Sequence, residues 1–179
     1  MDEGWSSLQP YRDSDRSWAH FSDDKVYRYT LGRRWSPTKP QIAFIMLNPS
    51  TATEKVLDPT VRRCVGFAKT WGFGSLEVGN LFALRSTDPK AIYDHSDPIG
   101  PDNDIAIQGI VQRSDRVIVA WGNHGKYKDR DKQVLRMIPS PEALSITASG
   151  SPAHPLYING KTMPKLYQPQ TIEMTVRTA

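Results

Sequence analysis

Side chains that both donate and accept hydrogen bonds follow four predicted strands of this chain. Asn48 comes directly after the first strand, and Asn80 lies near the end of the second. Asn123 and His124 follow the third strand, and His154 follows the fourth. Amides and imidazoles gathered in one shaped cleft would suit recognition of a planar polar ligand such as a nucleobase.

The elements that must position these residues alternate between strand and helix patterns. Apolar runs predict strands at 42–47, 76–81, 116–121 and 144–148, and alternating residues predict a half-exposed edge strand at 25–31. Apolar residues spaced by three and four predict helices at 60–71, 102–113 and 127–138. Residues 169–179 are expected to form a loose tail or a late edge strand.

Strands that are apolar on both faces, separated by helices, predict an α/β fold with a parallel sheet. Ligands of such sheets bind beyond the carboxyl ends of the strands. The four polar loops would therefore share one rim of the sheet. The length of 179 residues predicts a single domain over 1–179, with a core at 25–168 and a tail at 169–179.

Composition excludes several kinds of site. One cysteine, Cys64, rules out an internal disulfide and any zinc or iron–sulfur site built on thiolates. The sequence has neither a phosphate-binding Gly-Lys-Ser/Thr loop nor a His-Glu-X-X-His motif, so we predict no cofactor and no metal.

The longest apolar run, residues 42–47, is too short to span a membrane, and the first residues lack a signal-peptide pattern. We therefore expect a cytoplasmic monomer that is not bound to a membrane. The net charge of +4 permits a nucleic-acid partner without requiring one.

Four motifs in this order resemble the uracil-DNA glycosylase superfamily. They are Leu47-Asn48-Pro49-Ser50, Val78-Gly79-Asn80-Leu81-Phe82 followed by Arg85, Val117-Ile118-Val119-Ala120-Trp121-Gly122, and His154-Pro155-Leu156-Tyr157. The resemblance covers residues 42–157, with Met46 standing where the superfamily has glycine. More closely, the chain resembles a small family of bacterial and phage proteins with a Leu-Asn-Pro-Ser-Thr motif. The resemblance implies a three-layer sandwich around a central, mostly parallel four-stranded sheet.

The resemblance also implies a monofunctional DNA glycosylase. Such an enzyme would flip a modified or damaged base, expected to be a pyrimidine, out of DNA and hydrolyse its N-glycosidic bond, leaving an abasic site. Asn48 would position the attacking water, and His154 would stabilise the departing base. Modified phage DNA would be a candidate substrate, and phage defence a candidate role. The residues expected to bind substrate are Leu47, Pro49, Ser50, Asn80, Phe82, Arg85, His124 and Tyr157.

Several details stay open on the sequence alone. Three aromatic residues compete to stack on the base: Phe67, Phe82 and Trp121. Leu156 and Tyr157 compete as the wedge that fills the gap in the duplex. Candidate phosphate contacts are Ser50, Thr51, Arg85, Lys126, Lys128, Lys161 and Lys165.

Two carboxylates, Glu54 and Asp58, could approach the sugar, although a surface loop is the favoured position for both. The function also has two alternatives. One is a nucleic-acid-binding module of the same fold without catalysis. The other is a hydrolase of free nucleosides or nucleotides.

Overall fold

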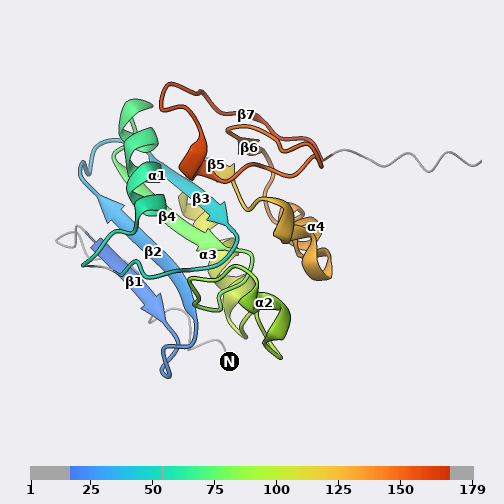
Figure 1. The fold of residues 1–179 in the computed structure, drawn as a ribbon. Helices are drawn as coiled ribbons and strands as arrows, with labels where there is room; N and C mark the ends of the chain where they lie inside the picture. The colour runs from blue at the N-terminus through green and yellow to red at the C-terminus, as the bar shows by residue number, and fades with distance from the viewer. Residues whose placement is uncertain (1–16, 54, 170–179) are drawn as a thin grey trace, which may run out of the picture.

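One sheet of seven strands runs through residues 17–53 and 55–169, the part of the chain that the computed structural model describes (Figure 1). The strands are β1 (Ser17–Phe21), β2 (Arg28–Arg34), β3 (Gln41–Met46), β4 (Ser75–Asn80), β5 (Arg116–Val119), β6 (Pro141–Ala143) and β7 (Lys165–Leu166). Their order across the sheet is β1-β2-β4-β3-β5-β6-β7.

The sheet is mixed. β3 pairs in parallel with β4 and β5, and β5 pairs in parallel with β6. The pairs β1–β2, β2–β4 and β6–β7 are antiparallel. The α/β class is therefore confirmed, whereas the prediction of a four-stranded, mostly parallel sheet is wrong. The described sheet has seven strands, and three of its six pairings are antiparallel.

Four α-helices and two 3₁₀ helices accompany the sheet in the described residues. They are α1 (Pro59–Thr70), α2 (Ala91–Asp94), α3 (Asn103–Arg113), η1 (Asn123–Asp129), α4 (Arg130–Leu135) and η2 (Pro155–Tyr157). The start of α1 has a clear local cause. The Asp58 side chain accepts a 2.8 Å hydrogen bond from the main-chain N–H of Val61, and Pro59 occupies the first helical turn.

Helices cover both faces of the sheet, which gives the protein three layers (Figure 1). Phe44 and Met46 of β3 pack with the buried face of α1, in a cluster that includes Phe67. Ile45 points to the opposite face and packs with Ile107 of α3. This alternation explains why the run at 42–47 is apolar throughout, because each residue faces one core or the other.

Most predicted elements form with small shifts at their ends, but three differ. The prediction of a half-exposed edge strand at 25–31 is wrong, because β2 lies between β1 and β4 and is buried over residues 28–32. The strand expected at 144–148 is displaced to β6, and within 144–148 only an isolated bridge joins Ile146 to Pro152. The helix expected at 127–138 is α-helical only at Arg130–Leu135, because Lys128 has a φ of +55° and interrupts it. Strands β1 and β7 and helix α2 were not predicted. Residues 170–179 of the expected tail lie outside the described residues.

Candidate functional site

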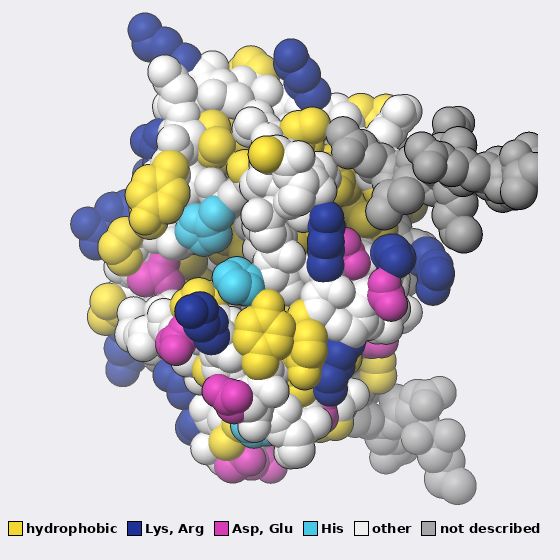
Figure 2. All heavy atoms as spheres, turned by 45° about the vertical axis from the view of Figure 1, so that its right-hand side comes forward, with side chains coloured by type: hydrophobic (Ala, Val, Ile, Leu, Met, Phe, Trp, Pro, Cys, Tyr) yellow, Lys and Arg dark blue, Asp and Glu magenta, His cyan; other side chains and the backbone are white. Residues whose placement is uncertain are grey.

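A pocket of about 310 Å³ opens where β3, β4 and β5 end and β2 begins. Six residues of the predicted site line it: Leu47, Asn48, Ser50, Asn80, His124 and His154. The lining also includes Arg28, Asp58, Thr60, Thr87 and Trp121. On the face drawn in Figure 2, histidine side chains lie near the centre, with hydrophobic and basic side chains around them.

Asn48 is held by hydrogen bonds to the neighbouring loop. Its Nδ2 donates to the carbonyl oxygen of Ser86 at 3.0 Å and to that of Pro49 at 3.3 Å. The main-chain N–H of Ser86 in turn donates to the Pro49 carbonyl at 2.9 Å. Within the described residues, Oδ1 of Asn48 has no protein partner. This oxygen is therefore available to accept a hydrogen bond from water or a ligand.

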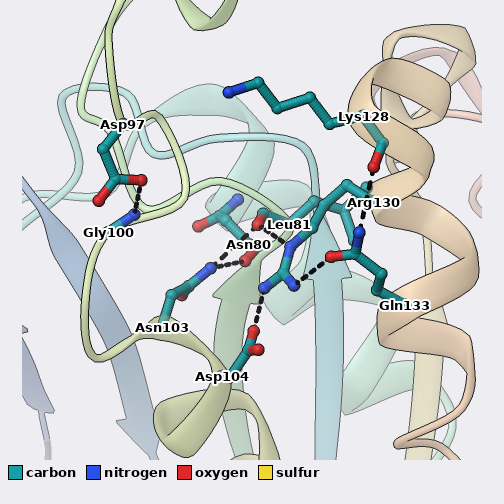
Figure 3. Close-up of polar contacts among 9 residues, drawn as sticks. All are labelled: Asn80, Leu81, Asp97, Gly100, Asn103, Asp104, Lys128, Arg130 and Gln133. Atoms are coloured by element: carbon teal, nitrogen blue, oxygen red, sulfur yellow. Dashed lines mark hydrogen bonds and ion pairs between the residues drawn. The ribbon is translucent and has the colours of Figure 1, made fainter.

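Buried polar side chains hold the end of β4, which carries Asn80 (Figure 3). Nδ2 of Asn103 donates to the carbonyl oxygens of Asn80 and Leu81, at 3.0 Å each. Nε of the buried Arg130 donates to the Leu81 carbonyl at 2.9 Å, and its guanidinium also pairs with Asp104. These contacts use main-chain atoms of Asn80 and hold its position in the rim.

The side chain of Asn80 is itself only 2% exposed, and its remaining accessible surface faces the pocket. Among the described residues, its amide group makes no hydrogen bond. An amide presents one acceptor and two donor hydrogens. Asn80 can therefore offer both kinds of hydrogen bond to a ligand.

His154 caps the start of η2, in surroundings that favour the neutral form of its imidazole. Burial lowers its pKa below the usual 6.5, and the negative charge of Asp58 offsets this only in part. Its Nδ1 accepts a 3.4 Å hydrogen bond from the main-chain N–H of Leu156. Because Nδ1 accepts, the neutral ring carries its proton on Nε2. That nitrogen can donate to a group that gains negative charge.

The pocket lining contains one carboxylate, Asp58, and one guanidinium, Arg28. Asp58 lies in the loop just before α1, where it is half-buried and lines the pocket. Its Oδ1 caps α1 by accepting the hydrogen bond from the N–H of Val61. Glu54 lies outside the described residues. Arg28 is 2% exposed, and burial lowers its pKa to about 10, so it stays charged at neutral pH.

Trp121 is the aromatic residue of the pocket lining. The other two stacking candidates are core residues, which corrects the prediction that Phe82 binds substrate. Phe82 is fully buried against Tyr127, and Phe67 packs on Trp71 beneath α1. Phe82 lies just after β4, and its ring packs in the hydrophobic cluster on the α3 side of the sheet.

His124 also faces the pocket and is oriented by an aromatic neighbour. Its Nδ1 is 2.7 Å from the hydroxyl oxygen of Tyr93, and the two rings are 5.8 Å apart. Tyr93 further makes an edge contact with Tyr127 at 4.6 Å between ring centroids. The loop after β5 is thus tied to the region of α2.

The remaining predicted substrate contacts lie outside the lining. Pro49 is buried behind Asn48, and Arg85 donates from Nη1 to the Lys25 carbonyl at 2.8 Å while stacking over Phe21. Tyr157 is 88% exposed on η2, next to the pocket residue His154. Among the candidate phosphate contacts, Nζ of Lys126 donates to the Ser149 carbonyl at 2.8 Å, whereas Lys165 is exposed on the edge strand β7.

Arg28 is a charged residue of the lining that was not predicted from the sequence. Inspection of strand ends alone misses it, because β2 runs antiparallel to β4 and begins at the rim where the others end. The main-chain N–H of Arg28 donates to the carbonyl oxygen of Ala83 at 3.0 Å, just beyond β4.

Metal and thiol chemistry have no evident site in the described part of the chain. Across residues 17–53 and 55–169, no three His, Cys, Asp or Glu side chains are close enough to hold a metal ion. Cys64 lies on the fully buried face of α1, and burial raises the pKa of its thiol. No helix in the same residues is long and apolar enough to cross a membrane.

Comparison with known proteins gives one match. A family model described as "Protein of unknown function (DUF1643)" matches residues 28–156. The chain belongs to this family. The segment matched by the DUF1643 model begins at Arg28 and takes in every residue that lines the pocket. No curated protein and no solved structure matches the chain.

Proposed function

We propose that this DUF1643 member is a DNA glycosylase that hydrolyses the N-glycosidic bond of a base held in the rim pocket. The observation that carries the proposal is the grouping of Asn48 and His154 around a single cavity together with Asn80. One of these side chains can orient water, one can stabilise a leaving base, and one can recognise it. These three roles are the ones that hydrolysis of an N-glycosidic bond requires.

Asn48 would orient the attacking water through Oδ1, since Nδ2 is occupied by the Ser86 and Pro49 carbonyls. The water oxygen forms a bond to C1′ of the sugar while the bond from C1′ to the base nitrogen breaks. The electron pair of the broken bond leaves with the base. Because the sugar passes through a state resembling an oxocarbenium ion, a neutral amide can suffice to guide water.

Asp58 gives the pocket one negative charge beside this reaction. A carboxylate stabilises a cationic sugar electrostatically and can take up the proton that the attacking water loses. Its Oδ1 is bound to the N–H of Val61, so the group is held in place by α1. We assign it the role of electrostatic stabiliser.

His154 would donate from Nε2 to the departing base as negative charge develops on it. A preorganised donor in a site shielded from water stabilises such charge more than solvent does. The lowered pKa of His154 suits this role, because the neutral ring donates one hydrogen bond without bringing a fixed positive charge. Asn80 would contact the polar edge of the base, and Trp121 would contact its face.

DNA is the proposed polymer because η2, which follows the pocket residue His154, carries an exposed aromatic residue. Tyr157 follows His154 and Pro155 on η2 and is 88% exposed. An exposed ring beside the pocket could fill the space that a flipped nucleotide leaves in a duplex. Next to η2, a groove on α1 is lined by Arg62 and Arg63.

Release of bases from a panel of DNAs tests the proposal. The panel contains uracil, mismatched thymine, hydroxymethylated and glycosylated pyrimidines, and whole genomes of phages with modified DNA. Strand scission after alkali reports abasic sites. We expect release of one kind of base, lost in Asn48→Ala and His154→Ala and retained in the matched surface variants Asn159→Ala and His95→Ala. Absence of release from every DNA would contradict the glycosylase assignment.

A further inference from the structure

Arg28 carries a buried positive charge that forms no ion pair within the described residues. Its Nη1 donates to the Ala52 carbonyl oxygen at 2.7 Å, and its Nε has no hydrogen-bond partner. A guanidinium has five N–H donors, so most of its bonding capacity is unused. Burial of a charge without such partners is costly, and it is retained where a ligand completes it.

The charges around Arg28 favour an anionic ligand. Among nearby charges, Asp58 has the largest effect on the Arg28 guanidinium, and the positive charges of Arg85 and Arg33 oppose it. The Oδ1 of Asp58 is already committed to the start of α1. Ser50 and Thr60 add hydroxyl groups to the same lining. Cations and hydroxyls together suit the binding of phosphate oxygens.

The strand order separates this cationic end of the pocket from its aromatic end. Arg28 begins β2 and Trp121 follows β5, with β4 and β3 between them. Three strand spacings correspond to about 14 Å between the two backbones. Long side chains that reach inward from both ends leave a shorter gap, which suits a ligand with an anionic group at one end and a flat ring at the other.

We infer that Arg28 binds a phosphate group of the substrate, with the attached nucleoside directed toward Asn80 and Trp121. The inference rests on the proposed function in taking the substrate to be a nucleotide. The phosphate belongs either to the DNA strand that carries the target base or to a free nucleotide. Both sources present the same oxygens to the guanidinium.

Equilibrium binding separates these sources without requiring catalysis. The probes are inorganic phosphate, the deoxynucleosides of uracil, thymine and cytosine, the 5′-monophosphate of each, and single-stranded oligonucleotides. We expect at least one nucleotide or oligonucleotide to bind about tenfold or more tightly than its nucleoside. An advantage seen with monophosphates identifies free nucleotides as the source, and one confined to oligonucleotides identifies DNA.

Variants assign that advantage to Arg28. Arg28→Met should remove the preference for the phosphorylated ligand and keep the affinity for the nucleoside. The exposed Arg136, changed in Arg136→Met, serves as the matched control and should keep the preference. If Arg28→Met does not fold, inorganic phosphate should still displace the nucleotide from the unaltered protein more strongly than chloride of equal ionic strength.

Equal binding of nucleosides and their phosphorylated forms would overturn the inference, as would an advantage that survives in a folded Arg28→Met protein. These outcomes are distinguishable from failure of the glycosylase proposal. Phosphate-dependent binding without base release from any DNA would support the role of Arg28 and contradict the glycosylase. If Arg28→Met leaves base release unchanged, the glycosylase proposal is supported and the role of Arg28 is contradicted.

Discussion

Nδ2 of Asn48 donates a 3.0 Å hydrogen bond to the carbonyl oxygen of Ser86, which joins the loop after β3 to the loop after β4. The contact fixes which end of the amide faces the protein. Both atoms near Nδ2 are carbonyl oxygens, those of Ser86 and Pro49. The position therefore requires a donor on one side and leaves an acceptor on the other.

A carboxylate at this position should be unfavourable. We expect Asn48→Asp to lower the free energy of unfolding by about 1–3 kcal/mol at pH above neutral, because a charged oxygen would face two carbonyl oxygens. Asn48→Ala removes only the hydrogen bonds and should cost about 1 kcal/mol. Urea unfolding of both variants measures the difference. An Asp variant as stable as the Asn protein would show that the amide is not held in this way.

Asn103 should contribute to stability through the end of β4. Replacing it in Asn103→Leu leaves the Asn80 carbonyl without this donor, which should cost about 1–3 kcal/mol because the region is buried. In urea unfolding, the midpoint should fall while the slope of the unfolding free energy with urea concentration stays unchanged. Asn159→Leu, at an exposed position, is the control. A loss no larger than that of the control would contradict the assigned role.

The pKa values of His20 and His154 predict how stability changes with pH. Burial lowers both from 6.5, so the unfolded chain binds protons at higher pH than the folded protein does. Stability from these residues is therefore complete above about pH 6.5 and declines as the pH falls toward the folded values. Urea midpoints at about pH 7.5 and about pH 5.5 measure the decline. The double variant His20→Gln/His154→Gln should show a smaller decline, and an unchanged decline would contradict the prediction.

Gly125 should control the position of Trp121 in the pocket. A Cβ at this glycine would lie 2.2 Å from Cδ1 of Trp121 and 2.9 Å from a methyl carbon of Leu81. Gly125→Ala should therefore displace the indole, lower stability by about 1–3 kcal/mol and weaken binding of flat ligands.

Gly66 provides the matched control, because no atom lies within 4 Å of the Cβ that Gly66→Ala would add. This residue lies within α1, so the change should raise stability by about 0.5–1 kcal/mol. Thermal unfolding of both proteins provides the comparison. A Gly125→Ala protein that is as stable as the parent and binds ligands equally would contradict the packing argument.

The central elements of the fold could be predicted from the sequence because their patterns are strong. The apolar run of β3 and the apolar spacing of α1 are local signals that packing reinforces. β7 has two residues, both exposed, and therefore leaves no periodic pattern. The two strands that were not predicted, β1 and β7, lie at the edges of the sheet. The full seven-stranded mixed sheet could therefore not be predicted.

The candidate site shows the same difference between residues with a local sequence signal and residues without one. Three residues that line the pocket were predicted, because each lies at the end of a predicted strand or in the loop that follows it. They are Asn48, Asn80 and His154. Arg28 was missed because its strand runs the other way, which no local pattern reveals. The choice between Phe82 and Trp121 depended on the direction of each ring, and that is set by packing rather than by spacing.

Mass-spectrometric detection of a free base released from the DNA panel tests the central claim most directly. The account predicts that the unaltered protein releases one kind of base. It also predicts that Asn48→Ala and His154→Ala each lower the rate about 100-fold or more. Folded protein that binds these DNAs and releases no base, or variants that release it at the unaltered rate, would contradict it.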